Sequence, residues 1–173
     1  MAQNSTKADL RPAVIRLARG VDLYREWRIR IHREAFGTEP DLNEIVVPGS
    51  EFITIFDQTR DARGARSILR DIQSWYSVTA SELRRHLQQG NADLTEAVQG
   101  FLAHFRTTLG FDLMAESGLL RDLATQAIAR GHLRTEEEWH LLKELRDDTD
   151  QTVLEAADMA EITRLMDEFE AEQ

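Results

Sequence analysis

The chain has 173 residues, of which 42% are hydrophobic and 30% are charged, and this length suits one compact domain. It contains no cysteine, which excludes a disulfide scaffold, a thiolate zinc site, an iron–sulfur cluster and a cysteine nucleophile. Its formal net charge of −10 argues against a general nucleic-acid binder, because such proteins need clustered Lys and Arg.

The sequence contains neither a membrane-spanning segment nor a secretory signal that would direct the protein out of the cytoplasm. No apolar run approaches the ~20 residues that a membrane-spanning helix needs. Residues 1–7 lack the charged-then-apolar layout of a secretory signal. We therefore expect a cytoplasmic protein without membrane association. We also expect residues 1–7 to be disordered and residues 8–170 to form a single helical domain.

The first element predicted in the chain is an amphipathic helix that begins near Leu10. Pro12 suits the first turn of such a helix, where its missing N–H costs nothing. Gly20 lies in the middle and weakens a helix by about 1 kcal/mol relative to Ala, so the segment is either one helix or two. Apolar residues recur every three or four positions, at Leu10, Val14, Leu17, Val21, Tyr24, Ile31 and Ala35.

Residues 44–56 carry the one hairpin signal in the chain. Two runs of β-branched and aromatic residues flank Pro48 and Gly49, as in a tight turn between two strands. Such a hairpin would have to pack on other elements, because two strands alone are marginal in water. The alternative is a helix that Ser50 caps and that carries Phe52, Ile55 and Phe56.

Helical periodicity resumes after Gly64 and continues to the end of the chain. Ala65 to Tyr76 form one stripe, and Thr79 with Glu82 has the pattern of a capping box for a short helix. Glycines follow the last apolar residue of three predicted helices, at Gly90, Gly110 and Gly131. Further helices begin at Thr135 and near Val153. The pattern predicts a predominantly all-α fold, a compact bundle of six or seven helices with at most one small hairpin.

Charge is distributed unevenly along the chain. Residues 7–33 hold eight basic and three acidic residues, a net +5, whereas residues 135–173 hold three basic and 14 acidic residues, a net −11. This polarity predicts that the basic helix contacts an acidic protein surface, either residues 151–170 of the same chain or another subunit. The simpler interpretation is two solvated faces.

Five residues are candidates for contact with a partner, namely Trp27, Arg28, Arg30, Trp75 and Tyr76. Tryptophan, tyrosine and arginine are the residue types that most often dominate the energy of protein interfaces. The alternative is an ordinary amphipathic helix that exposes its arginines, with the two neighbouring aromatic residues buried at a helix end.

A metal site is suggested only weakly. Glu136, His140 and Glu144 share one helix face, and Glu137 to His140 match the Glu-x-x-His motif of di-iron bundles. That chemistry needs a second copy of the motif, and the chain has none. Phosphate-loop, dinucleotide-binding, nucleophile-elbow, zinc-protease and EF-hand motifs are also absent from the sequence. We therefore expect no metal and no other cofactor.

These observations favour a non-catalytic, acidic, helical protein–protein interaction module, such as a regulator, an inhibitor, an immunity-type protein or an assembly factor. Its partner would be another protein or a second copy of the chain. The alternative function is that of a helical enzyme, or of a metal- or ligand-binding bundle, which uses its histidine and carboxylate residues.

Overall fold

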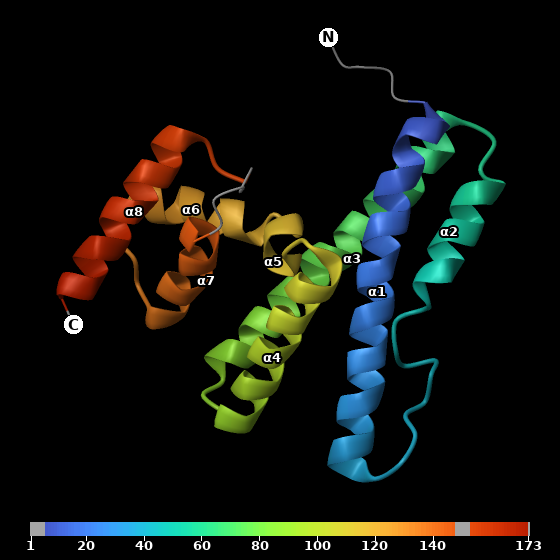
Figure 1. Cartoon of the computed structure of the whole chain (residues 1–173), viewed down its shortest axis with the longest axis horizontal. Coiled ribbons are helices and arrows are strands. Elements are labelled where there is room, and N and C mark those ends of the chain that lie inside the picture. Colours follow the sequence, from blue (N-terminus) through green and yellow to red (C-terminus); the bar gives the residue numbers. More distant parts are fainter. Residues whose placement is uncertain (1–5, 148–152, 173) are drawn as a thin grey trace. The chain divides into compact units, whose positions relative to one another are not determined.

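The computed structural model describes residues 6–147 and 153–172, and these ranges contain eight helices and no strand (Figure 1). The chain divides into two compact units: unit 1 comprises residues 1–76 and 100–111, and unit 2 comprises residues 77–99 and 112–173. The all-α prediction is confirmed, with one helix more than expected. The helices are α1 (Lys7–Phe36), α2 (Gly49–Gln58), α3 (Ala62–Gln88), α4 (Ala92–Leu109), α5 (Leu113–Glu116), α6 (Leu119–Arg130), α7 (Glu136–Asp147) and α8 (Ala156–Ala171).

Helix α1 is one uninterrupted helix of 30 residues. Thr6 and Asp9 form a capping box at its start, and hydrogen bonds from Thr6 lower the pKa of Asp9. Thr6 and Lys7 therefore belong to the start of α1, whereas the predicted disorder of residues 1–5 lies outside the described residues. Because α1 starts earlier than expected, Pro12 lies inside the helix and not in its first turn.

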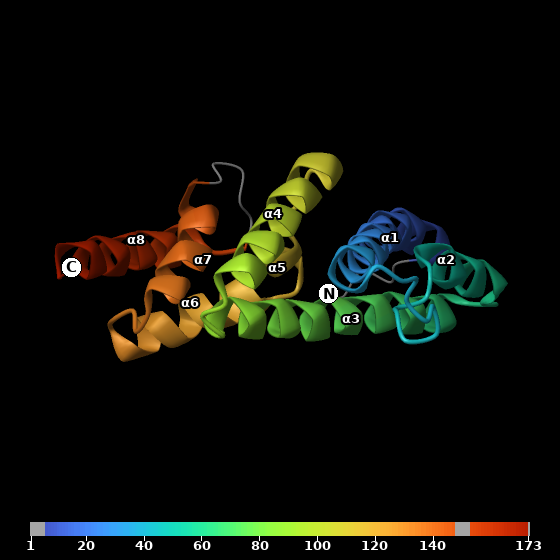
Figure 2. The same ribbon diagram turned by 90° about the horizontal axis from the view of Figure 1, so that it is seen from below.

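Of the two alternatives for residues 44–56, the hairpin is wrong and the helix carrying Phe52, Ile55 and Phe56 is confirmed, because residues 49–58 form helix α2. Pro48 occupies the N-cap position without a side-chain hydrogen bond, so Ser50 is not the cap either. The Gly49 N–H donates instead to a carboxylate oxygen of Asp22 in α1, at 2.6 Å. This bond and the complete burial of Phe56 hold α2 against α1 (Figure 2). The β-branched residues of this segment are thus part of a helix whose first N–H is bound by Asp22, 27 positions earlier in the chain.

Helix α3 runs without a break through the predicted capping box at Thr79, so that prediction is also wrong. Thr79 is only 3% exposed and lies in the helix interior. Ile72, Tyr76, Ala80 and Leu83 are all buried, which means that one apolar stripe continues past the cap-like sequence. Burial of this stripe stabilises a continuous helix at the position where the local sequence has the pattern of a helix start.

The predicted ends of three helices are confirmed, since Gly90, Gly110 and Gly131 have φ angles of 70°, 74° and 76°. The prediction missed α5, a single turn whose N-cap Asp112 accepts a hydrogen bond from the Ala115 N–H at 2.9 Å. Within the described ranges, no helix is both long enough and apolar enough to cross a membrane.

The core of unit 1 is built from aromatic rings of α1, α3 and α4. Trp27 stacks on Phe101 with ring centroids 4.6 Å apart, and Tyr24 meets the edge of the same ring at 5.8 Å. Tyr76 is fully buried and donates its hydroxyl hydrogen to the Leu17 carbonyl at 2.9 Å. The apolar stripe of α1 therefore has its partners within unit 1.

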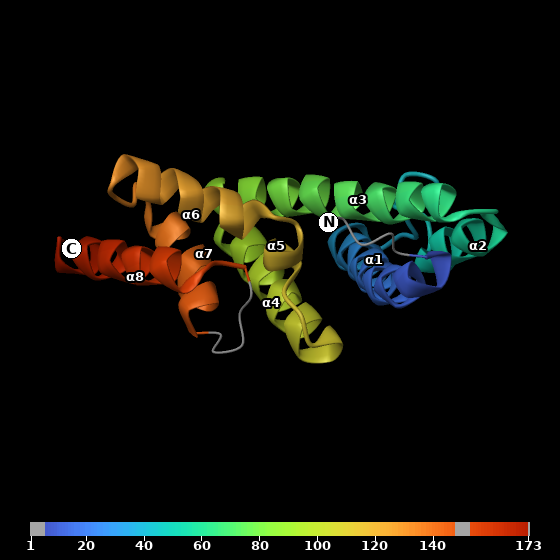
Figure 3. The same cartoon turned by 90° about the horizontal axis from the view of Figure 1, so that it is seen from above.

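Unit 2 contains a cluster of helices in which α8 packs against α6 and α7 (Figure 3). Ile162 and Met166 are buried, and Phe169 is half-buried. The apolar stripe of α8 thus has partners within its own unit. Other buried residues of this cluster include Leu120, Leu123, Ala124, Ala127, Leu142, Leu145 and Leu165.

Gly20, which appears in the sequence as a weak point of α1, occupies a position of close approach. A Cβ atom there would lie 1.8 Å from the Tyr76 hydroxyl oxygen and 2.8 Å from Cζ of Phe105. Gly20→Ala should therefore destabilise the protein by about 2–4 kcal/mol, because overpacking and loss of the Tyr76 hydrogen bond outweigh the better helix propensity of Ala. Urea denaturation followed by circular dichroism measures the change.

Gly100 in α4 provides the matched control. It also lies inside a helix, but nothing would contact its added Cβ within 4 Å. Gly100→Ala should stabilise the protein by about 0.5–1 kcal/mol through helix propensity alone. Stabilisation by both substitutions would contradict the close approach at Gly20.

Candidate functional site

Two of the five residues expected at a partner surface are part of the core. Trp27 is 7% exposed and Tyr76 is fully buried. Their rings pack on other aromatic rings of unit 1, and the Tyr76 hydroxyl donates a hydrogen bond to a backbone carbonyl of α1. This burial argues against either ring as a contact residue.

The other three candidates lie nearer the surface of unit 1. Trp75 is half-buried, and its ring meets the edge of Tyr24 at 5.4 Å. Arg28 donates to the Tyr24 hydroxyl oxygen at 2.9 Å. Arg30 is exposed and lies 3.9 Å from Glu34, one turn along the helix. The five residues are thus divided between core and surface and do not make one continuous site.

The histidine and carboxylate residues of α7 do not converge. Glu136 and His140 approach to 3.5 Å, but both side chains are mostly exposed, at 75% and 57%. The side chain of Glu144 lies outside the described residues. In the part of the chain that the structure describes, no group of three or more His, Asp or Glu side chains could hold a metal ion.

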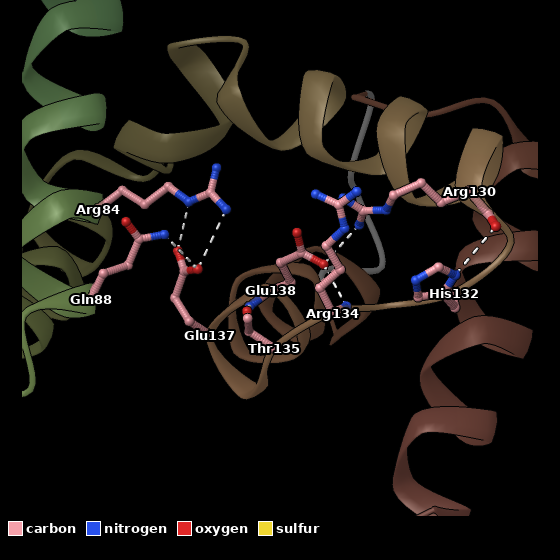
Figure 4. Close-up of polar contacts among 8 residues, drawn as sticks. All are labelled: Arg84, Gln88, Arg130, His132, Arg134, Thr135, Glu137 and Glu138. Atoms are coloured by element: carbon pink, nitrogen blue, oxygen red, sulfur yellow. Dashed lines mark hydrogen bonds and ion pairs between the residues drawn. The ribbon is translucent and has the colours of Figure 1, made fainter.

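Glu137 and Glu138, at the start of α7, reach different partners (Figure 4). Glu137 receives hydrogen bonds from Arg84 at 2.7 Å and from Gln88 at 3.2 Å, both in α3. Its side chain is 16% exposed, and that of Arg84 is 26% exposed. This bond ties the end of α3 to the start of α7 inside unit 2.

Glu138 is 5% exposed, and one of its oxygens receives two hydrogen bonds (Figure 4). Arg130 of α6 donates at 2.8 Å and the backbone N–H of Arg134 at 2.9 Å. Thr135 caps the helix by accepting the Glu138 N–H at 3.1 Å. Arginines neutralise both neighbouring carboxylates, and the hydrogen bonds of this cluster join α3, α6 and α7.

A groove opens on the surface of unit 1, between one face of α1 and the end of α4. Its volume is about 380 Å³. Pro12, Ile15, Arg16 and Arg19 follow the i, i+3, i+4, i+7 spacing of a single helix face. We call this feature the α1–α4 groove; its described lining is Pro12, Ile15, Arg16, Arg19, Thr108, Leu109 and Phe111.

The α1–α4 groove combines apolar walls with positive charge. The guanidinium of Arg16 lies 4.5 Å from the centre of the Phe111 ring, a cation–π distance. Ile15, Leu109 and Phe111 are half-buried, and Arg19 is exposed. None of the described lining residues is acidic. The groove therefore offers an apolar floor beside two guanidinium groups.

Two cations near the start of α1, Lys7 and Arg11, have partners within unit 1. Arg11 makes a two-pronged contact with Asp57 at 3.1 Å, and its hydrogen bonds hold the pKa of that carboxyl below the usual value. Lys7 donates to two backbone carbonyls at the end of α2, at 2.8 Å and 2.7 Å. For Arg19, the described residues provide no ion pair. Its charge is therefore available to a ligand.

A second hollow, of about 490 Å³, lies on α3 in unit 2. Its described lining comes from α3 alone and mixes one apolar residue, Val78, with polar and charged ones: Ser77, Ser81, Glu82 and Arg85. Val78 is 65% exposed. This described lining, a single helix face, encloses a ligand less well than the two helical walls of the α1–α4 groove do.

In comparisons with known proteins, no protein-family model, no curated protein and no solved structure matches the chain. The site must therefore be judged on its own geometry. The groove residues were not predicted as a site, although the sequence shows the helical spacing of Pro12, Ile15, Arg16 and Arg19. The residues of the opposite wall, Thr108, Leu109 and Phe111, lie about 90 positions later in the chain, and no local sequence pattern links them to the α1 face.

Proposed function

We propose that this chain is a non-catalytic helical module that binds another protein at the α1–α4 groove. The observation that carries the proposal is the lining itself, in which two arginines border half-buried apolar side chains. Arginine and aromatic residues are enriched at protein interfaces, and an open groove of two helical walls suits a protein segment better than a small substrate. A cytoplasmic location is part of this proposal.

Site-specific photo-crosslinking tests the proposal in the cells that make the protein. A photoreactive phenylalanine derivative is placed at Thr108, which lies in the groove, and separately at Arg63, an exposed position of α3 in the same unit. We expect one protein adduct from Thr108 and none of that mass from Arg63. Adducts from Arg63 alone, or the same adducts from both, would contradict the proposal.

The protein captured at Thr108 is then purified and titrated against two Leu→Glu variants. Leu109→Glu places a charge on the apolar wall of the groove and should weaken binding at least about tenfold. Leu42→Glu makes the same change at a residue that is already 52% exposed, and should leave affinity within about twofold. Equal affinities of the two variants would mean that the adduct formed without docking in the groove.

A further inference from the structure

The part of α3 that belongs to unit 1 presents a polar, basic face. Arg63, Ser67, Arg70 and Ser74 follow the i, i+4, i+7, i+11 spacing of a single helix face, and all four residues are exposed. We call these four residues the α3 arginine face. Arg66 lies between them in the sequence, but it is already engaged within the chain and is not part of the proposed contact.

The arginines of this face lack a counter-ion. For Arg63 and Arg70, and for Arg60 just before the helix, the described residues provide no ion pair. On α1 of the same unit, by contrast, the exposed Arg33 lies 2.7 Å from Glu39. The positive charge of the α3 arginine face is therefore available to an anionic partner.

The carboxylates nearest in sequence form no ion pair with these arginines. Asp61 accepts a hydrogen bond from the Gly64 N–H at 2.8 Å and so caps the start of α3. Asp71 follows Arg70 directly, and neighbouring residues of a helix point about 100° apart. Arg63 lies in the first turn of α3, where the helix dipole disfavours a cation. The stability of the helix therefore does not explain this arrangement.

The two units differ in net charge. Unit 1 contains 13 basic and 11 acidic residues, a net +2, whereas unit 2 contains 8 basic and 20 acidic residues, a net −12. Salt screens exposed charges over about 8–10 Å, so a ligand at the α3 arginine face meets mainly the local charge. The total of −10 therefore does not exclude an anionic partner for unit 1.

The chemistry of the face indicates which anionic partner fits. A protein interface has an apolar core, a helix at a membrane surface has an apolar side, and single-stranded nucleic acid stacks on aromatic rings. The α3 arginine face supplies none of these. Among the described residues, the large hydrophobic side chains that are exposed lie elsewhere, at Phe36, Leu42, Val47, Ile55 and Val78.

The backbone of duplex DNA requires only what the face contains. Arginine and serine side chains donate hydrogen bonds to phosphate oxygens, and the release of condensed counterions supplies the affinity. Exposed ion pairs with protein carboxylates lack that second contribution and are worth only about 0–1 kcal/mol each. A polyphosphate therefore suits a face without an apolar anchor better than an acidic protein does.

We propose that the α3 arginine face binds the phosphate backbone of double-stranded DNA. Arg63 and Arg70 pair with phosphates, and the hydroxyls of Ser67 and Ser74 donate to phosphate oxygens. Binding does not depend on base sequence, because phosphate contacts carry no base information. The face shares no residue with the α1–α4 groove, so this site stands or falls separately from the proposed function.

Fluorescence anisotropy with the full-length protein tests the proposal. The probe is a fluorescein-labelled, mixed-sequence DNA duplex of about 20 base pairs, and at about 50 mM salt we expect saturable binding that weakens steeply as salt rises. R63Q/R70Q should weaken binding at least about tenfold and reduce the slope of log affinity against log salt by about two, one for each lost phosphate contact. R63K/R70K keeps both charges and should keep the slope.

R30Q/R33Q is the matched control. It removes two exposed arginines from α1 in the same unit, so it changes the net charge by the same amount. It should change DNA affinity less than about twofold and leave the salt slope unaltered. Circular dichroism of each variant verifies that the helices are retained.

Four results would overturn the proposal. They are absence of DNA binding at low salt, an equal loss of affinity in R63Q/R70Q and R30Q/R33Q, a salt slope that R63Q/R70Q leaves unchanged, and loss of binding in a folded R63K/R70K. Two further probes exclude other partners. Binding of polyglutamate as tightly as DNA would make an acidic protein the partner, and equal binding of phosphatidylserine vesicles would make it a membrane surface.

Discussion

Phe101→Ala should lower the free energy of unfolding by about 3–5 kcal/mol, the usual range for removing a buried aromatic ring. Phe101 is 2% exposed and is the ring on which Tyr24, Trp27 and Phe105 converge, with centroids 4.6–5.8 Å away. Its removal leaves a cavity between α1 and α4 within unit 1. Urea denaturation followed by circular dichroism measures the loss.

Phe36→Ala makes the same chemical change at a residue that is 71% exposed. It should alter the free energy of unfolding by no more than about 0.5 kcal/mol, as surface changes do. If Phe101→Ala cost no more than Phe36→Ala, the ring would be solvated, and α4 would present a different face to α1.

Helices were predictable from the sequence where every local signal agreed. In α4 and α6 the apolar spacing and a terminal glycine indicate the same C-terminal end, and the structure confirms it. Thr135 was likewise recognised as the start of α7, because its hydroxyl caps a helix that three glutamates follow.

Predictions failed where a distant contact outweighs the local pattern. Residues 49–58 are rich in β-branched and aromatic side chains, yet Asp22 anchors their first N–H from 27 positions earlier. A Cβ atom on Gly49 would lie 2.1 Å from the Ala18 carbonyl oxygen, so this glycine serves a helix contact and not a turn. Only the folded chain brings these groups together.

The candidate site shows the same limit of local patterns. Trp27 and Tyr76 were chosen by residue type, but an aromatic ring that suits an interface suits a core equally well, and both are buried here. The α1–α4 groove depends on Arg16 meeting Phe111, 95 positions apart. Half of its lining was visible as one helix face, and the other half is supplied by tertiary packing.

Glu138→Ala should destabilise unit 2 by about 3–5 kcal/mol, because it leaves a buried cation without its counter-ion. The Arg130 side chain is 15% exposed and its Nε already lacks a hydrogen-bond partner, so Glu138 provides its described charge compensation at 2.8 Å. The Arg134 N–H loses its acceptor in the same variant. Denaturation followed by the fluorescence of Trp139, the tryptophan of unit 2, measures the effect.

Glu136→Ala, two residues earlier, is the control. Its side chain is 75% exposed and lies 3.5 Å from His140, so its loss should cost no more than about 0.5 kcal/mol. The double variant Arg130→Met with Glu138→Leu should recover most of the stability that Glu138→Ala loses, since removing both charges also removes the cost of burying them. A double variant as unstable as Glu138→Ala would show that the hydrogen bond to Arg134, and not the ion pair with Arg130, holds the start of α7 in place.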